Sequence, residues 1–241
     1  VRRKRKSVSV RRSCHSTSPG VLRRHHVDGA LGAAYMPFLE MAAKDGRVDL
    51  GETRFPVFDF RLRDCFSIAF SGHKWTGAPW PCGIFMTKSK YQLLPPENPE
   101  YIGSPDTTFA GSRNGLSAIV LWDYLARYSL DRQIQKAITL EELAQYTQEK
   151  LVELGDELHE DLRVKRSPLS LAVRFKAAPD DIVFKYSLSG ESLFEDGEAR
   201  DYSHVYMMEH VTKDIIDSLV RDLKFAKLFA ADRRATVHQS W

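Results

Sequence analysis

The chain has 241 residues, of which 28% are charged and 43% are hydrophobic, and it contains three cysteines. This length is sufficient for one large hydrophobic core, or for one large and one small domain. No stretch approaches the roughly 18 consecutive apolar residues that a membrane-spanning helix needs, so a membrane partner is not expected. Three cysteines are too few for a disulfide framework, which predicts a reducing compartment and a cytoplasmic location.

The net charge of +3 conceals an uneven distribution. Residues 1–24 carry nine Lys and Arg side chains and no acid, which leaves 26 basic and 32 acidic side chains in the remainder. That acidic remainder argues against nucleic acid as a partner. The basic segment is too polar to fold alone, and three interpretations of it stay open: a nuclear signal or nucleic-acid arm, an organelle transit peptide, or sequence that is not native to the protein.

Three short apolar runs after the basic segment are predicted to form strands separated by loops. They lie at residues 26–28, 66–70 and 82–86. The second run is closed by Ser71 and Gly72, and an apolar run bounded by turn residues predicts a buried strand of a parallel sheet. The third run predicts another such strand. Residues 91–112 are rich in Pro and Gly and are predicted to form a loop.

From Gly115 onward the apolar spacing becomes helical and predicts two successive helices, the second over residues 131–159. The end of the chain predicts a small α+β unit, because alternating apolar residues indicate half-buried strands. These strands are expected at residues 169–175, 182–186 and 204–208. Thr212 is placed to cap a last helix, and residues 195–198 are predicted to form a solvated loop.

Lys74 and Asp28 carry the residue types best suited to chemistry. Lys74 follows a predicted buried strand directly, and partial desolvation makes a lysine amine a usable nucleophile toward a carbonyl. The neighbouring Ser71 and His73 could bind an anion such as phosphate, although an ordinary surface lysine after a turn explains the same pattern. Asp28 ends another strand and precedes small residues on which a flat ring can lie. A carboxylate there can pair with a protonated ring nitrogen, or it can cap a helix.

An acid after one strand and a lysine after another are together what a pyridoxal phosphate enzyme needs. Several segments, in the same order, resemble the C-terminal half of the group II pyridoxal-phosphate-dependent amino acid decarboxylases. The chain looks most like the shorter bacterial-type histidine decarboxylases and the valine decarboxylase-like proteins. The resemblance covers residues 25–225, and the segments that carry it are residues 26–32, 67–74, 103–108, 111–115 and 204–212.

The resemblance implies a role for each matching residue. Lys74 binds pyridoxal phosphate as a Schiff base, and Asp28 pairs with the ring nitrogen. Ala30 packs on one face of the ring, while Ser71 and His73 contact the phosphate or order the lysine. A loop that lies near the partner subunit's active site in this family would bind phosphate or substrate through Thr107, Thr108, Ser112, Arg113 and Asn114. No group of cysteines and histidines has the spacing of zinc ligands, so no metal is expected.

The resemblance also implies a fold class and a domain order. The expected fold is α/β: the C-terminal part of a fold-type I pyridoxal phosphate enzyme, with a mostly parallel sheet and helices, plus a small α+β C-terminal domain. Residues 25–130 would be the remainder of the large cofactor-binding domain, and residues 131–241 a connecting helix and the small domain. Several strands of the family's large sheet belong to its other half, so a strand edge that is normally paired is expected to be exposed.

The implied function is that of a carboxy-lyase, which releases CO₂ and an amine from histidine or a related L-amino acid. The family works as a homodimer, and a homodimer is expected here. The alternative is a non-catalytic fragment or paralogue that acts as an interaction or regulatory partner.

Overall fold

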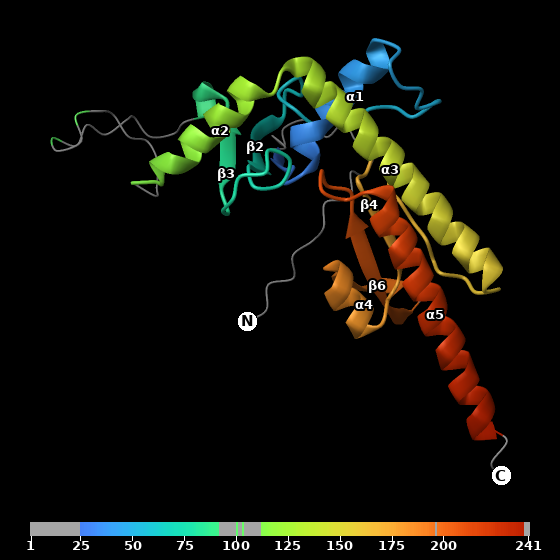
Figure 1. Cartoon of the computed structure of the whole chain (residues 1–241). Helices are drawn as coiled ribbons and strands as arrows, with labels where there is room; N and C mark the ends of the chain where they lie inside the picture. Colours follow the sequence, from blue (N-terminus) through green and yellow to red (C-terminus); the bar gives the residue numbers. More distant parts are fainter. Residues whose placement is uncertain (1–24, 92–99, 101–102, 104–111, 196, 239–241) are drawn as a thin grey trace. The chain divides into compact units, whose positions relative to one another are not determined.

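The computed structural model describes residues 25–91, 100, 103, 112–195 and 197–238 (Figure 1). The chain divides into two compact units. The first comprises residues 1–37 and 56–129, and the second comprises residues 38–55 and 130–241. The predicted basic segment and most of the predicted loop at 91–112 lie outside the described residues. Among the described helices, none is long and apolar enough to cross a membrane.

The first unit contains a three-stranded sheet in the order β1-β2-β3. Its strands are β1 (His25–Asp28), β2 (Cys65–Ser71) and β3 (Gly83–Thr87). β1 and β2 are parallel, because the chain between them is long enough for a crossover and includes helix α1 (Gly32–Lys44). β3 is antiparallel to β2, and residues 72–82 join the two strands. The three strand predictions are confirmed in place, but the expectation that β3 is parallel was wrong.

The first unit ends with a short 3₁₀ helix, Ser89–Tyr91, and helix α2 (Gly115–Arg127). The predicted helix from residue 115 is therefore confirmed. Asn114 caps α2, because its Oδ1 accepts a hydrogen bond of 3.0 Å from the backbone N–H of Leu116. None of the 13 described residues of α2 is buried, although Trp80 donates a hydrogen bond of 2.7 Å to the hydroxyl of Ser117.

The second unit packs two long helices with a small antiparallel sheet in the order β4-β6-β5. Its elements are α3 (Leu130–Glu157), β4 (Ala172–Lys176), β5 (Ser189–Glu195), β6 (Glu198–Tyr206) and α5 (Lys213–His238). Leu151, Val173, Met207 and Ile216 have no exposed surface, and Phe175 is 1% exposed, so the helices and the sheet share one core. The prediction that Thr212 caps the last helix is confirmed, because the N–H of Ile215 donates to its hydroxyl at 3.4 Å.

Two predictions for the second unit were wrong. Residues 182–186 form the end of helix α4 (Asp180–Tyr186) rather than a strand. Two acids in the first turn stabilise this helix through its dipole, and the apolar run that looked like a strand buries only Ile182. Glu195 and Glu198 are paired with each other at the ends of β5 and β6, so these two residues belong to strands and not to a loop.

A buried ion pair fastens α3 to the segment that precedes β4. The guanidinium of Arg166 donates to the carboxylate of Glu141, and both side chains are less than 10% exposed. Arg166 also donates to the carbonyl of Ser170 at 2.7 Å. Both charges are thus compensated inside the second unit, as buried charges must be.

Candidate active site

The ends of two parallel strands bring the predicted site residues to one edge of the first sheet. Asp28 on β1 is paired in register with Ala69 on β2. The backbone stays joined beyond this pair, because Gly29 N–H donates to the carbonyl of Ala69 at 2.9 Å and Ser71 N–H donates to the carbonyl of Ala30 at 3.0 Å. Asp28 and Ala30 therefore lie directly beside the end of β2, where the turn that contains Lys74 begins.

Asp28 presents an exposed carboxylate at this edge. Its Oδ1 accepts a hydrogen bond of 3.3 Å from the N–H of Ala30, two residues along the chain. Its Oδ2 accepts no hydrogen bond from the described residues. Helix α1 begins later, at Gly32, so the carboxylate does not cap a helix. This geometry leaves a charged oxygen available to an external partner.

Lys74 lies in a tight turn at residues 72–76 that follows β2. Trp75 is 2% exposed and packs on Tyr35, with the two ring centroids 5.9 Å apart. Gly77 closes the turn, since its N–H donates to the carbonyl of Lys74 at 3.2 Å and its φ of +63° suits glycine. The buried neighbour fixes the backbone of Lys74, while the Lys74 side chain itself is half-buried and not enclosed by the core.

His73 and Gly72 attach the turn to the start of β3. The His73 Nδ1 lies 3.1 Å from the backbone N of Cys82 and 3.0 Å from its carbonyl oxygen. It can accept from the N–H when unprotonated, or donate to the carbonyl when protonated. Gly72 N–H donates to the same carbonyl at 3.0 Å. A Cβ on Gly72 would stand 2.7 Å from the Cys82 Sγ, so the close approach requires glycine. This contact joins the lysine turn to the start of β3.

The second predicted set, which was expected near the partner subunit's active site, is only partly described. Thr107 and Thr108 lie outside the described residues. Ser112 and Arg113 are exposed, and Asn114 uses its side-chain oxygen to cap α2. Of the ten predicted site residues, those described at one edge are Asp28, Ala30, Ser71, His73 and Lys74.

His26 also belongs to this surface, although its place there was not predicted from the sequence. Its Nδ1 lies 2.7 Å from the hydroxyl of Ser67, and its ring stacks on that of Phe85. Side chains two residues apart on a strand point to the same face, so His26 and Asp28 share one face of the sheet. The period of two was visible in the sequence, but the partner on β3 was not.

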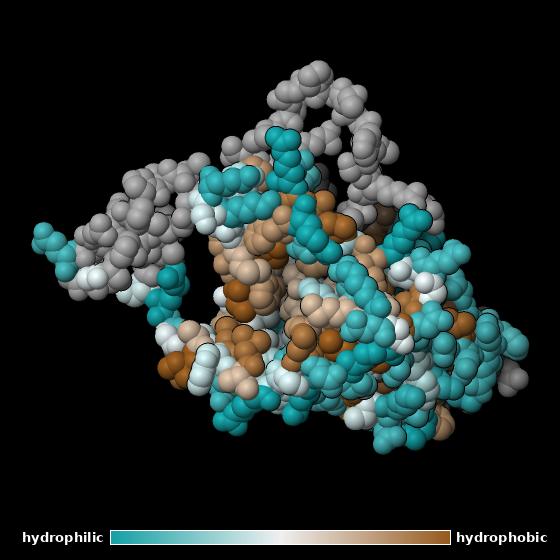
Figure 2. Space-filling view, turned by 90° about the horizontal axis from the view of Figure 1, so that it is seen from above, coloured by the Kyte–Doolittle hydropathy of each residue, from teal (hydrophilic) through white to brown (hydrophobic). Residues whose placement is uncertain are grey.

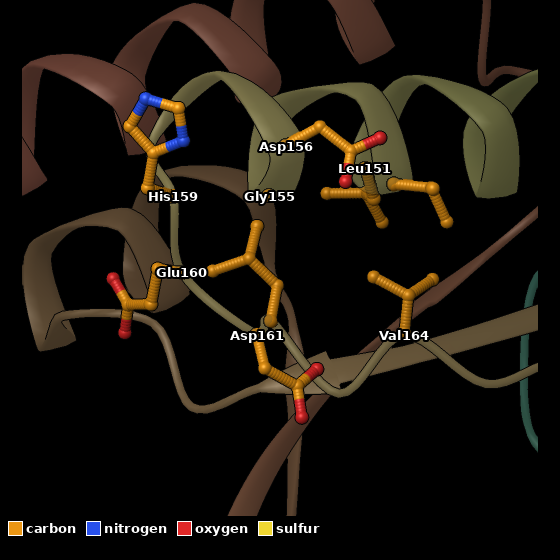
Figure 3. A pocket seen from close by; sticks show the side chains of 9 residues that line it. Leu151, Gly155, Asp156, His159, Glu160, Asp161 and Val164 are labelled. Carbon is orange, nitrogen blue, oxygen red and sulfur yellow. The ribbon is translucent and has the colours of Figure 1, made fainter.

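A surface hollow in the second unit holds none of the predicted residues. It lies at the end of α3, where Asp156, His159, Glu160 and other side chains line it (Figure 3). Glu160 is paired there with Lys176 and Lys227, and hydrogen bonding to Lys176 in particular keeps the pKa of its carboxyl below the usual value. The acidic side chain of Glu160 thus joins β4 and α5 to the end of α3.

No family model matches the chain. Curated relatives do match it, and they include two histidine decarboxylases. The protein from Mesorhizobium japonicum is 30% identical over 198 residues, a match that covers 82% of this chain and 46% of the relative. The protein from Solanum lycopersicum is 31% identical over 199 residues, which covers 82% of this chain and 41% of the relative.

Solved structures that match the chain include another amino acid decarboxylase. L-methionine decarboxylase from Streptomyces sp. 590, in its internal aldimine form, is 46% identical with a TM-score of 0.74, and the match covers 83% of this chain and 41% of that one. A sphingosine-1-phosphate lyase from Burkholderia pseudomallei, at 21% identity and a TM-score of 0.60, shows the shared fold.

These matches show that the chain has the fold of the fold-type I pyridoxal phosphate enzymes. Within that class it is homologous to the group II amino acid decarboxylases, as the sequence motifs indicated. The chain spans less than half the length of the relatives reported above.

Proposed function

We propose that this chain forms part of a pyridoxal-phosphate-dependent amino acid decarboxylase, a carboxy-lyase, and that Lys74 and Asp28 are its catalytic residues. The observation that carries the proposal is the parallel register of β1 and β2. It sets the exposed carboxylate of Asp28 beside the end of β2. β2 ends at Ser71, and Lys74 follows three residues later. The homology to decarboxylases supports the same reaction class.

The residues at this edge fit pyridoxal phosphate in their chemistry. Asp28 offers an oxygen free to hold a proton at the ring nitrogen, and Ala30 is small enough for a flat ring to lie against it. Ser71 offers a hydroxyl for the phosphate, and the half-buried amine of Lys74 can bind the cofactor's aldehyde. When bound, the cofactor supplies an electron sink for the bond that breaks as CO₂ leaves. His73 would hold the lysine turn in place through Cys82.

The proposed substrate is an L-amino acid. The sequence motifs favour histidine, whereas the solved methionine decarboxylase has the higher identity, at 46% against 30–31% for the two histidine decarboxylases. Both amino acids therefore belong in the first assay. We further propose a homodimer and a cytoplasmic location. The dimer rests on the family resemblance, and the location rests on the free thiols of Cys65 and Cys82.

Borohydride reduction after incubation with pyridoxal phosphate tests the cofactor site, with the modified peptide mapped by mass spectrometry. We expect a stoichiometric adduct on Lys74 that is lost in Asp28→Ala and retained in Asp64→Ala, an exposed aspartate just before β2. Adducts scattered over surface lysines, or no adduct, would contradict the proposal.

Assays for the release of CO₂ and amine from methionine and histidine then distinguish an active decarboxylase from a non-catalytic relative. A decarboxylase releases both products and loses this activity in Lys74→Ala. A non-catalytic relative that still binds the cofactor would form the Lys74 adduct but release neither product.

A further inference from the structure

The pairing of β1 with β2 changes just before the proposed catalytic aspartate. The register shifts between His25 and His26, as it does at a β-bulge. Beyond this point the pairing is regular, and it ends with Asp28 opposite Ala69. A bulge re-aims the side chains that follow it, and bulges are frequent beside active sites. A slip of one residue in the pairing would move the Asp28 carboxylate to the opposite face of the sheet.

Strand β1 has no buried residue that could fix its register. Burial of one face usually specifies how two strands pair, because a slip would carry the buried side chains to the solvent face. Of the four residues of β1, three are exposed and Val27 is half-buried. Among the described residues, β2 is the single strand beside β1. Another interaction is therefore needed to select the pairing that aims Asp28.

A side-chain hydrogen bond crosses the two strands at the first regular pair after the shift. His26 and Ser67 lie opposite each other, and the His26 Nδ1 is 2.7 Å from the Ser67 hydroxyl oxygen. The hydroxyl can donate to an unprotonated Nδ1, and a protonated Nδ1 can donate to the hydroxyl, so the bond forms in either state of the ring. In a slipped register Ser67 would face a different residue of β1, and this bond would be lost.

The imidazole ring of His26 also contacts β3. It stacks on the ring of Phe85, with the two centroids 6.2 Å apart and the planes inclined by 26°. Phe85 is 66% exposed, and other apolar residues of the chain likewise stay open to solvent in the space-filling view (Figure 2). The stack therefore orients the imidazole without shielding it from water, and the hydrogen bond to Ser67 is the contact that depends on the register.

We propose that His26 is a positioning residue. Its hydrogen bond to Ser67 locks the register of β1 on β2, and this lock keeps the Asp28 carboxylate on the face where it can meet the ring nitrogen of pyridoxal phosphate. The positioning role rests on the proposed function of Asp28, whereas the register lock does not. His26 acts only through the strand that carries Asp28, and it touches neither substrate nor cofactor.

Hydrogen exchange of the full chain without pyridoxal phosphate, followed by NMR, tests the register lock. The amide of Gly29 reports on the pairing, because it donates to the carbonyl of Ala69 at 2.9 Å. We expect His26→Ala to raise the exchange rate of this amide by roughly fivefold, the effect of losing one net hydrogen bond. His25→Ala is the matched control and should leave the rate unchanged, because His25 is also exposed but lies before the shift in register.

Two further substitutions separate the hydrogen bond from the stack. His26→Asn places a polar amide atom near the position of Nδ1 and should keep the wild-type exchange rate. His26→Phe keeps an aromatic ring without the hydrogen bond and should exchange like His26→Ala. An unchanged rate in His26→Ala would overturn the lock, and so would protection that is kept in His26→Phe and lost in His26→Asn.

The protonation of the cofactor's ring nitrogen tests the consequence for Asp28. In the complex with ¹⁵N-labelled pyridoxal phosphate, the chemical shift of this nitrogen reports whether it carries a proton. We expect His26→Ala to move the shift toward the value of Asp28→Ala, while His26→Asn and His25→Ala keep the wild-type value. A wild-type shift in His26→Ala would overturn the positioning role.

Failure of the proposed function gives a different result. If the chain binds no cofactor, or if Asp28→Ala leaves the nitrogen shift unchanged, the proposed role of Asp28 is wrong. The exchange rates measured without cofactor still decide whether His26 locks the register, so the two failures are distinguishable.

Discussion

The two units of the chain differ sharply in how much apolar surface they bury. Among the residues that the structure describes, the first unit buries five hydrophobic side chains, namely Tyr35, Cys65, Ile68, Trp75 and Ala78. The remaining buried hydrophobic residues belong to the second unit, where α3, α5 and the β4-β6-β5 sheet share one core. The second unit has a core sufficient for a small domain, whereas in the described part of the first unit β1 and β3 have one neighbouring strand each and α2 buries no residue.

The proposed catalytic residues lie in the unit with the smaller core. Lys74 is held locally, by Trp75 packing on Tyr35 and by the bonds of His73 to Cys82, and not by a deep hydrophobic interior. Functional segments are commonly drawn from the less stable parts of a protein. Most of the buried core therefore lies in the second unit, whereas the proposed catalytic residues lie in the first. Substitutions in the two units should affect stability and cofactor labelling differently.

The largest expected effect is on the core of the second unit. Phe175→Ala removes a ring that is 1% exposed and should lower the free energy of unfolding by about 3–5 kcal/mol. Phe194→Ala, on strand β5 of the same sheet, removes a ring that is 78% exposed and should cost less than about 0.5 kcal/mol. Urea unfolding followed by circular dichroism measures both. Similar losses for the two variants would break the contrast between core and surface in this unit.

A smaller effect is expected in the first unit. Gly72→Ala places a Cβ 2.7 Å from the Cys82 Sγ and 3.0 Å from Leu121, an overpacking that should cost about 1–3 kcal/mol. The same shift should reduce labelling of Lys74 by pyridoxal phosphate and borohydride, because Gly72 opens the lysine turn.

The control is Gly83→Ala, which meets no atom within 4 Å and should leave both readouts unchanged. Removing the sulfur in the double variant Gly72→Ala/Cys82→Ala should restore part of the loss. If the single variant labels and unfolds like the wild type, local packing does not position the lysine.

The smallest effect concerns His204 on β6, in the second unit. Burial lowers the pKa of His204, the nearby positive charge of Arg174 acts in the same direction, and the carboxylate of Glu191, 3.1 Å away, opposes them. A lowered pKa means that the unfolded chain binds a proton more readily than the folded one. Stability from His204 is therefore present above pH 6.5 and is lost as the pH falls below it.

His204→Gln should flatten the decline in unfolding free energy between pH 7 and pH 5 by under about 1 kcal/mol. The exposed His210→Gln should keep the wild-type slope. Urea titrations at several pH values decide the matter, and an unchanged slope in His204→Gln would show that this histidine is not responsible.

Local patterns in the sequence predicted much of the fold. Apolar runs and periodicity placed β1, β2, β3, α2, α3, β4 and β6, and Thr212 was identified as a helix cap from its own side chain and position. The pattern failed at residues 182–186, where three consecutive apolar residues resemble a strand but two preceding acids start a helix. Helix dipole and burial, which act over the whole segment, outweighed β propensity there.

Features that depend on distant residues were harder to predict. The direction of β3 depends on how residues 72–82 fold back onto β2, and the contact of His73 with Cys82 is part of that return. Asp28 and Lys74 could be named from their types and their places after strands. Their common sheet edge is set by a register that no single segment encodes.

The buried pair of Glu141 and Arg166 has a consequence for how this sequence can change over time. Replacing one partner strands the other charge in the interior, whereas replacing both with apolar residues of similar size is tolerated far better. The two positions are separated by a long stretch of chain, yet each restricts the substitutions that the other accepts. In related proteins the two positions should therefore vary together or stay fixed together. A relative with a substitution at only one of them needs another group to compensate the remaining buried charge.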